Sequence, residues 1–195
     1  AVMNAMVPGR RQFLLATLSA AGGLAVGVGF APDAAALPTN TEIWDTPPPA
    51  GAHEVTAWVV IEPDESVLIR VAKQEMGQGI LTALPMLVAE ELGCDWTKVR
   101  AEYASAHRNL VEKNVYGRMG TGGSRSVREN YRLLQQAGAS ARERLVAAAA
   151  ARWGVAPAAC SVRDGRITHP PSGRTLGFGA VAADAARITL TAEPA

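Results

Sequence analysis

The stretch from residue 126 to residue 153 constrains the fold most, because small and apolar side chains recur in it at helical spacing. This recurrence predicts a long helix with one buried face. Ser126 and Glu129 have the spacing of a capping box, in which each side chain satisfies an unpaired N–H of the first turn. Gly154 stands where helices commonly end. Because several residues of the buried face are small, another element can pack close to it; the face consists of Val127, Tyr131, Leu134, Gly138, Ala141, Leu145 and Ala148.

The other expected elements alternate between strand and helix. Runs of β-branched and alternating apolar residues predict strands, and turn residues separate them. Strands and helices mixed with hairpins predict an α+β domain with one mixed sheet. The expected strands are 55–62, 66–72, 99–104, 160–163 and 166–168, the expected helices besides the long one are 82–92 and 178–185, and residues 105–123 are expected to form a loop.

Composition excludes several classes of protein. Apolar residues make up 48% of the 195 residues, which is enough for a core and argues against global disorder. The formal net charge is +1, with acids and bases interspersed, so neither nucleic acid nor a membrane surface is indicated as a partner. The two cysteines and three histidines are scattered, which argues against a zinc site or an iron–sulfur cluster built from this chain alone.

The N-terminus has the pattern of an export signal. Arg10 and Arg11 precede Phe13, and a run of small and apolar residues follows over 16–31. Alanines at 34–36 offer a cleavage site for a signal peptidase. The pattern resembles a twin-arginine leader and predicts a periplasmic protein. An uncleaved membrane anchor is the alternative, although four glycines dilute the apolar run.

These signals divide the chain into three parts. Twin-arginine export carries proteins that are already folded, often around a cofactor, so the leader also suggests a redox cofactor. Four prolines after the leader predict an irregular, exposed linker. The expected boundaries are 1–36 for the export signal, 37–52 for the linker and 53–195 for the folded domain.

The first stretch that could take part in chemistry is residues 74–79, Gln-Glu-Met-Gly-Gln-Gly. Glycines without a Cβ let a backbone approach a ligand closely. They also leave Gln78 projecting, with an amide donor and a carbonyl acceptor. A plain strand-to-helix turn that needs positive φ explains the same pattern, and short glycine patterns are common. The spacing alone therefore favours the plain turn.

The second stretch is residues 120–126, Gly-Thr-Gly-Gly-Ser-Arg-Ser, directly before the long helix. Exposed backbone N–H groups, hydroxyls and a guanidinium at the positive end of a helix dipole favour a phosphate or pyrophosphate. No lysine follows the glycines, which excludes an ordinary P-loop. A flexible loop that ends in a good N-cap is an equally good explanation on these residues alone.

Taken together, the motifs resemble a known family. Residues 71–79 and 89–93, followed by Thr-Gly-Gly-Ser at 121–124 ahead of an alanine-rich helix, are similar to the molybdopterin-binding region of the xanthine dehydrogenase and aldehyde oxidase family. The similarity is strongest to the isoquinoline 1-oxidoreductase β-subunit branch, which also has a twin-arginine leader. Residues 152–155 and 160–165 also resemble that branch, so the resemblance covers nearly the whole chain.

The resemblance implies an oxidoreductase of the molybdenum hydroxylase type. In this family a metal-bound hydroxide attacks a carbon of an N-heterocycle or an aldehyde while hydride passes to a sulfido ligand, with water as the oxygen source. The metal is held by a pterin, often as molybdopterin cytosine dinucleotide. The resemblance implies that Gln78 donates a hydrogen bond to a metal-bound oxygen and that no side chain of this chain ligates the metal. It also implies that the remaining cofactor contacts come from Gly77, Gly79, Gly122, Gly123, Ser124, Arg125 and Ser126.

The sequence also departs from the family pattern. The catalytic base of the family is a glutamate in a glycine-rich stretch, and no such stretch follows Gly179, so we expect no catalytic residue in this chain. The implied partners are the remainder of the large subunit, a [2Fe–2S] small subunit, a c-type cytochrome and a small-molecule substrate. The alternatives are a non-catalytic assembly or binding domain that keeps the fold without metal, and a nucleotide-binding module.

Overall fold

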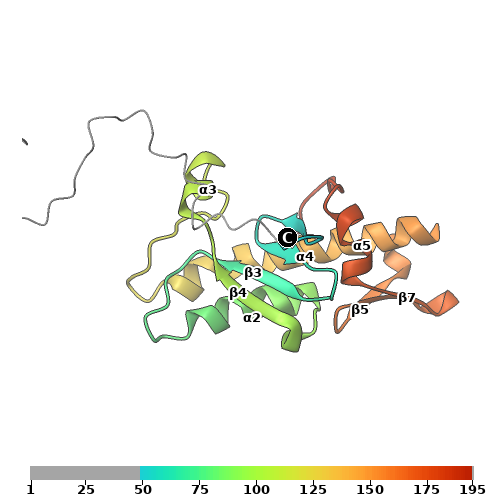
Figure 1. Cartoon of the computed structure of the whole chain (residues 1–195), viewed down its shortest axis with the longest axis horizontal. Coiled ribbons are helices and arrows are strands. Elements are labelled where there is room, and N and C mark those ends of the chain that lie inside the picture. The colour runs from blue at the N-terminus through green and yellow to red at the C-terminus, as the bar shows by residue number, and fades with distance from the viewer. Residues whose placement is uncertain (1–48, 195) are drawn as a thin grey trace, which may run out of the picture. The chain divides into compact units, whose positions relative to one another are not determined.

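A four-stranded mixed sheet forms one part of the domain in the computed structural model, which describes residues 49–194. The strand order is β1-β2-β3-β4, and only the β3–β4 pair is parallel. A parallel pair needs a crossover, and helix α2 supplies it between β3 and β4 (Figure 1). The bounds are β1 His53–Thr56, β2 Val59–Ile61, β3 Val67–Val71, α2 Ile80–Leu92 and β4 Val99–Tyr103.

The α+β class with a mixed sheet is confirmed, but the first expected strand is wrong in one respect. Residues 55–62 do not form one strand, because the chain turns back at Ala57 and Trp58 and pairs β1 with β2. The N–H of Trp58 donates to the hydroxyl oxygen of Thr56 at 3.3 Å, which closes a tight local turn. The Trp58 ring is buried and meets the ring of Tyr116 edge-on at 5.1 Å between centroids. This distant aromatic contact favours the turn over a straight strand.

The long helix α4 (Ser126–Trp153) is confirmed and ends at Gly154 with a φ of 67°. It packs along α2, as Figure 1 shows. α2 begins two residues earlier than expected, so Pro85 lies inside the helix and not in its first turn. The core between these helices and the sheet consists of fully buried apolar side chains, among them Val59, Ile69, Val88, Leu134 and Leu145.

A second sheet follows α4. It is antiparallel, with the order β5-β6-β7, so the described residues form two sheets where one was expected. The strand β7 was not expected, because its residues Arg-Thr-Leu-Gly show no clear alternation of apolar and polar side chains. The expected final helix is confirmed as α5, which packs on α4. The bounds are β5 Ser161–Arg163, β6 Arg166–His169, β7 Arg174–Gly177 and α5 Phe178–Ala185.

Part of the expected 105–123 loop is helical. The helix α3 (Ala106–Val111) is capped by Ser105, whose hydroxyl oxygen accepts from the N–H of Arg108 at 3.0 Å. Six residues are too few to show helical periodicity. Three short 3₁₀ helices complete the described elements: η1 Trp96–Lys98, η2 Pro157–Ala159 and η3 Pro170–Ser172.

An ionic network fastens α3 to the sheet. The guanidinium of Arg70, a residue only 8% exposed, donates to carboxylate oxygens of Glu54 at 2.5 Å and Glu102 at 3.0 Å. Arg108 donates to both carboxylate oxygens of Glu54, at 2.7 Å and 2.5 Å, and its guanidinium lies 5.8 Å from the centre of the Tyr116 ring. Burial alone would raise the pKa of Glu54, but the hydrogen bonds from Arg108 and Arg70 outweigh it and lower that pKa.

We expect Glu54→Gln to lower the free energy of unfolding at neutral pH by about 2 kcal/mol, because it leaves a buried guanidinium short of a charged partner. A carboxyl whose pKa is lower in the folded state stabilises the fold above its unfolded pKa, and this stabilisation is lost as pH falls through the folded pKa. The difference between wild type and variant should therefore shrink on the acid side of pH 4.5. Urea unfolding of wild type and variant at several pH values measures this difference in the free energy of unfolding.

Glu112→Gln is the matched control for this substitution. Glu112 also accepts from Arg108, at 2.7 Å, but it is exposed and lies one helical turn away. Exposed pairs of this kind contribute about 0.5 kcal/mol. If both variants lost the same free energy of unfolding at neutral pH, burial of the Glu54 network would add nothing to the stability of the domain.

Candidate functional site

The two glycine-containing loops that the sequence singles out lie against each other. We call residues 74–79 the Gly-Gln-Gly loop and residues 118–125 the Gly-Gly-Ser loop. The ammonium group of Lys73 donates to the carbonyl oxygens of Arg118 and Gly120, the latter at 3.1 Å. The N–H of Gln74 donates to the hydroxyl oxygen of Thr121 at 2.8 Å. The structure thus brings together segments that are more than 40 residues apart in the sequence.

The Gly-Gln-Gly loop has the backbone that its glycines indicated. Gly77 has a φ of 90° and Gly79 a φ of 76°, and a Cβ added at either position would meet no atom within 4 Å. The Gln78 side chain does not project as expected. Its carbonyl oxygen accepts from the N–H of Met76 at 2.5 Å, and its amide donates to the carbonyl of Gln74 at 2.8 Å. Gln78 is exposed but folded onto its own loop.

Glu75 organises this loop and was not recognised from the sequence as doing so. Its carboxylate accepts from the backbone N–H groups of Gly77 at 2.7 Å, Gly79 at 3.0 Å and Leu81 at 3.1 Å. These hydrogen bonds, that of Leu81 first, lower the pKa of Glu75. The N-terminus of α2 therefore already carries a negative charge. An acidic residue just before a helix start was the available signal.

The Gly-Gly-Ser loop differs from the expected capping box. The helix begins at Ser126, and Arg125 is in the N-cap position without a side-chain capping hydrogen bond. Glu129 instead pairs with Arg125, at 3.4 Å between its carboxylate oxygen and the guanidinium. Positive φ at Gly123 (62°) and Ser124 (53°) sets this path of the chain. The capping-box prediction is therefore wrong.

The two helix N-termini thus have different electrostatic character. That of α2 is filled by the Glu75 carboxylate. Among residues 49–194, by contrast, no side chain accepts from the first-turn N–H groups of α4, and the acid of that turn, Glu129, is paired with Arg125. An anion is therefore favoured at α4 and disfavoured at α2. A Cβ added at Gly120 or Gly122 meets nothing within 4 Å, so a ligand can approach this backbone. Open glycine backbones and unpaired donors fit a phosphate-bearing cofactor.

Other candidate residues of the 105–123 segment have different roles. Arg108 is held by Glu54 in the ionic network. Arg118 contributes its backbone carbonyl to Lys73. Within the described residues, no group of three or more histidine, cysteine, aspartate or glutamate side chains could hold a metal ion. Cys94 and Cys160 are both free and partly buried, and burial raises the pKa of the Cys94 thiol to about 11.

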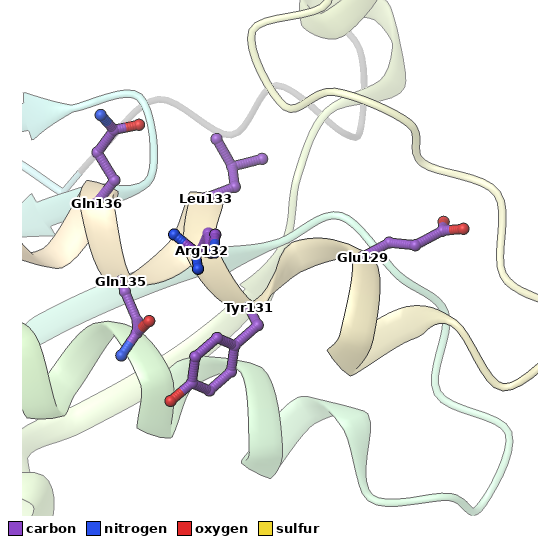
Figure 2. Close-up of a pocket in the computed structure, with 6 residues that line it drawn as sticks. All are labelled: Glu129, Tyr131, Arg132, Leu133, Gln135 and Gln136. Atoms are coloured by element: carbon purple, nitrogen blue, oxygen red, sulfur yellow. The ribbon is translucent and has the colours of Figure 1, made fainter. Parts of the chain in front are cut away.

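A surface pocket of about 660 Å³ lies on the N-terminal half of α4. Figure 2 shows its side chains spread around the helix, with Tyr131 and Gln135 on one side and Leu133 and Gln136 on another. None of the predicted cofactor residues lines it. This pocket is therefore separate from the two loops.

The profile of the molybdopterin cofactor-binding domain matches residues 15–194. The chain therefore belongs to the molybdopterin cofactor-binding domain family. The predicted resemblance to the molybdopterin-binding region of the xanthine dehydrogenase and aldehyde oxidase family is confirmed.

Two curated relatives are each 34% identical to this chain and match 89% of it. One is the membrane-bound aldehyde dehydrogenase [pyrroloquinoline-quinone] of Gluconacetobacter polyoxogenes, and the other is isoquinoline 1-oxidoreductase subunit beta of Brevundimonas diminuta. The match covers 21% of the first relative and 22% of the second, so the chain spans about a fifth of their length.

Solved structures are also similar. Quinoline 2-oxidoreductase from Pseudomonas putida 86 is 25% identical with a TM-score of 0.49, and the match covers 67% of this chain and 16% of that one. The reconstituted CO dehydrogenase from Oligotropha carboxidovorans is 25% identical with a TM-score of 0.46, and the match covers 64% and 15%.

Proposed function

We propose that this chain is part of the large subunit of a molybdenum hydroxylase that oxidises an N-heterocycle or an aldehyde with water as the oxygen source. The observation that carries the proposal is the meeting of the Gly-Gln-Gly and Gly-Gly-Ser loops through Lys73 and Thr121, in a chain of the molybdopterin cofactor-binding domain family. The names of the relatives, an isoquinoline oxidoreductase subunit and an aldehyde dehydrogenase, support both substrate classes.

The residues of the two loops divide the cofactor between them in this proposal. The open backbone at Gly77 and Gly79 accommodates the pterin, and Gln78 directs its amide toward the reacting centre after leaving its contacts with Met76 and Gln74. The exposed N–H groups at the start of α4 and the side chains of residues 124–126 hold the phosphates, and cytosine dinucleotide is the proposed form. When bound, the cofactor supplies the redox-active metal.

The catalytic base and the electron acceptors are proposed to come from elsewhere. No glycine-rich stretch of the kind that carries the base glutamate of the family follows Gly179 in this sequence. We therefore assign the base to the remainder of the large subunit, and electron transfer to a [2Fe–2S] subunit with a c-type cytochrome beyond it. The relative named as subunit beta supports a multi-subunit assembly.

The location is proposed to be the periplasm, reached by the twin-arginine pathway, with membrane association as a further possibility. The proposed leader and most of the proposed linker lie outside the residues that the structure describes. Within residues 49–194, no helix is both long and apolar enough to cross a membrane. Cell fractionation tests the location, and a protein found only in the cytoplasm would contradict it.

Metal analysis of the complex purified from its native cells tests the function. We expect about one molybdenum per copy of this chain, together with iron from a partner subunit. The expected absorbance is that of [2Fe–2S] clusters. An intact complex without molybdenum would favour a non-catalytic assembly domain, and binding of a free nucleotide without molybdenum would favour a nucleotide-binding module.

A quinone-dependent aldehyde dehydrogenase is the second candidate, because one relative is named for pyrroloquinoline quinone. The two candidates predict different cofactors in the same purified complex. Denaturation would release a pterin from the complex in the first case and the quinone in the second, and mass spectrometry would identify the released cofactor. A quinone without molybdenum would overturn the first proposal.

A further inference from the structure

Lys73 is unusual among the charged residues of the domain. It lies two residues after the end of β3 and is only 1% exposed. Lysines at strand ends normally extend their ammonium groups into solvent. Burying an ammonium group is costly unless acceptors surround it. The position of this side chain therefore calls for an explanation beyond packing.

The acceptors of Lys73 belong to a distant loop. Its ammonium group donates to the carbonyl oxygens of Arg118 and Gly120, which flank Met119 in the Gly-Gly-Ser loop. Among residues 49–194, Lys73 has no carboxylate as a hydrogen-bond acceptor, although the charge of Glu129 favours the ammonium form. Burial, which outweighs that effect, lowers the pKa of Lys73, and Arg118 and Arg125 act in the same direction.

A second bond joins the same loops at the next residue. The N–H of Gln74 donates to the hydroxyl oxygen of Thr121, at 2.8 Å. Lys73 and Gln74 thus hold the Gly-Gly-Ser loop at three points: Arg118, Gly120 and Thr121. Both donors lie directly before Glu75, whose carboxylate orders the Gly-Gln-Gly loop. One short segment therefore fixes the position of both loops.

We propose that Lys73 is a positioning residue, which clasps the Gly-Gly-Ser loop to the end of β3 and so sets its place relative to the Gly-Gln-Gly loop for cofactor binding. The hydrogen bonds of Lys73 and Gln74 support the clasp itself, and its role in cofactor binding rests on the proposed function. In the proposed function a pterin dinucleotide contacts both loops at once, so a fixed relative position of the loops favours its binding. A preformed site avoids the cost of ordering a loop on binding.

Trypsin reports on the clasp directly, because the carbonyl that Lys73 holds belongs to the peptide bond after Arg118. We expect Lys73→Met, which keeps the aliphatic stem and removes the donors, to speed cleavage after Arg118 about tenfold. Cleavage after Arg187, whose side chain is 80% exposed, should stay at the wild-type rate. Lys98→Met, at an exposed lysine, is the matched control and should change neither rate.

Thr121 provides an independent variant in case Lys73→Met does not fold. Thr121→Val keeps the shape and removes the acceptor of the Gln74 N–H, so cleavage after Arg118 should again accelerate. Thr121→Ser keeps the hydroxyl and should restore the wild-type rate. Molybdenum content of the complex purified from native cells should fall about tenfold in Lys73→Met and stay unchanged in Lys98→Met.

The outcomes separate the clasp from the proposed function. An unchanged cleavage rate after Arg118 would overturn the clasp, and equal acceleration after Arg118 and Arg187 would make Lys73 an ordinary core residue. Faster cleavage after Arg118 with full molybdenum content would overturn the positioning role. A wild-type complex without molybdenum that still shows Lys73-dependent protection would overturn the proposed function and leave the clasp intact.

Discussion

Gly138→Ala is expected to destabilise the domain by about 3 kcal/mol, although alanine favours a helix over glycine by about 1 kcal/mol. The reason is the close approach of α2 and α4. A Cβ added at Gly138 would lie against the carbonyl oxygen of Val88 and 3.0 Å from the Cβ of Glu91. Because one of these atoms is backbone, the contact is relieved only if the helices move apart. The buried side chains between them would then lose packing contacts.

Urea unfolding and thermal melting measure this effect, and the melting temperature should fall by about 10 °C. Gly122→Ala is the matched control. A Cβ added at Gly122 meets no atom within 4 Å, and its φ is not in the left-handed region. Its effect on stability should stay within about 0.5 kcal/mol. A Gly138→Ala variant that is more stable than wild type would refute the close helix contact.

Gln78→Ala is expected to lower the turnover of the assembled enzyme about a hundredfold, the usual effect of removing one well-placed hydrogen-bond donor at a reacting centre. Its stability should change little. The Gln78 side chain is exposed, and within the described part of the chain its hydrogen bonds are to the backbone of Met76 and Gln74. The loop remains ordered without it, because Glu75 holds the N–H groups of Gly77 and Gly79.

Steady-state kinetics and thermal melting of the purified complex test this prediction together. Gln74→Ala is the matched control in the same loop: the backbone groups that bind Thr121 and Gln78 remain, and only an exposed side chain is lost. Its turnover should match wild type. Proportional losses of stability and activity in Gln78→Ala would give Gln78 a structural role in place of a functional one.

Local signals in the sequence predicted much of the fold. The 3.6-residue period of apolar and small residues located α4, and Gly154 marked its end. Alternation and the Asp-Gly turn located β5 and β6. The elements α3 and β7 were missed for different reasons: β7 shows no clear alternation of apolar and polar side chains, and the six residues of α3 are too few to show a helical period. The helix α3 also depends on a distant partner, because Arg108 donates to Glu54.

The candidate site shows the same division between local and distant causes. The sequence by itself indicated the two glycine-containing stretches and the left-handed backbone at Gly77 and Gly79. Their family pattern determined the class of cofactor. The capping-box prediction at Ser126 was wrong because the loop before it is held by distant hydrogen bonds from Lys73 and Gln74, which no local pattern contains.

Only the tertiary structure decided how the loops meet. Lys73 reads in the sequence as an ordinary strand-end lysine, yet it is buried and donates to two carbonyl groups more than 40 residues away. The contacts of Glu75 are local by comparison, because its carboxylate accepts from N–H groups only two to six residues further along the chain. Sequence patterns record the preferences of neighbouring residues, whereas the contacts of Lys73 depend on which segments the parallel β3–β4 pairing and the α2–α4 packing bring together in space.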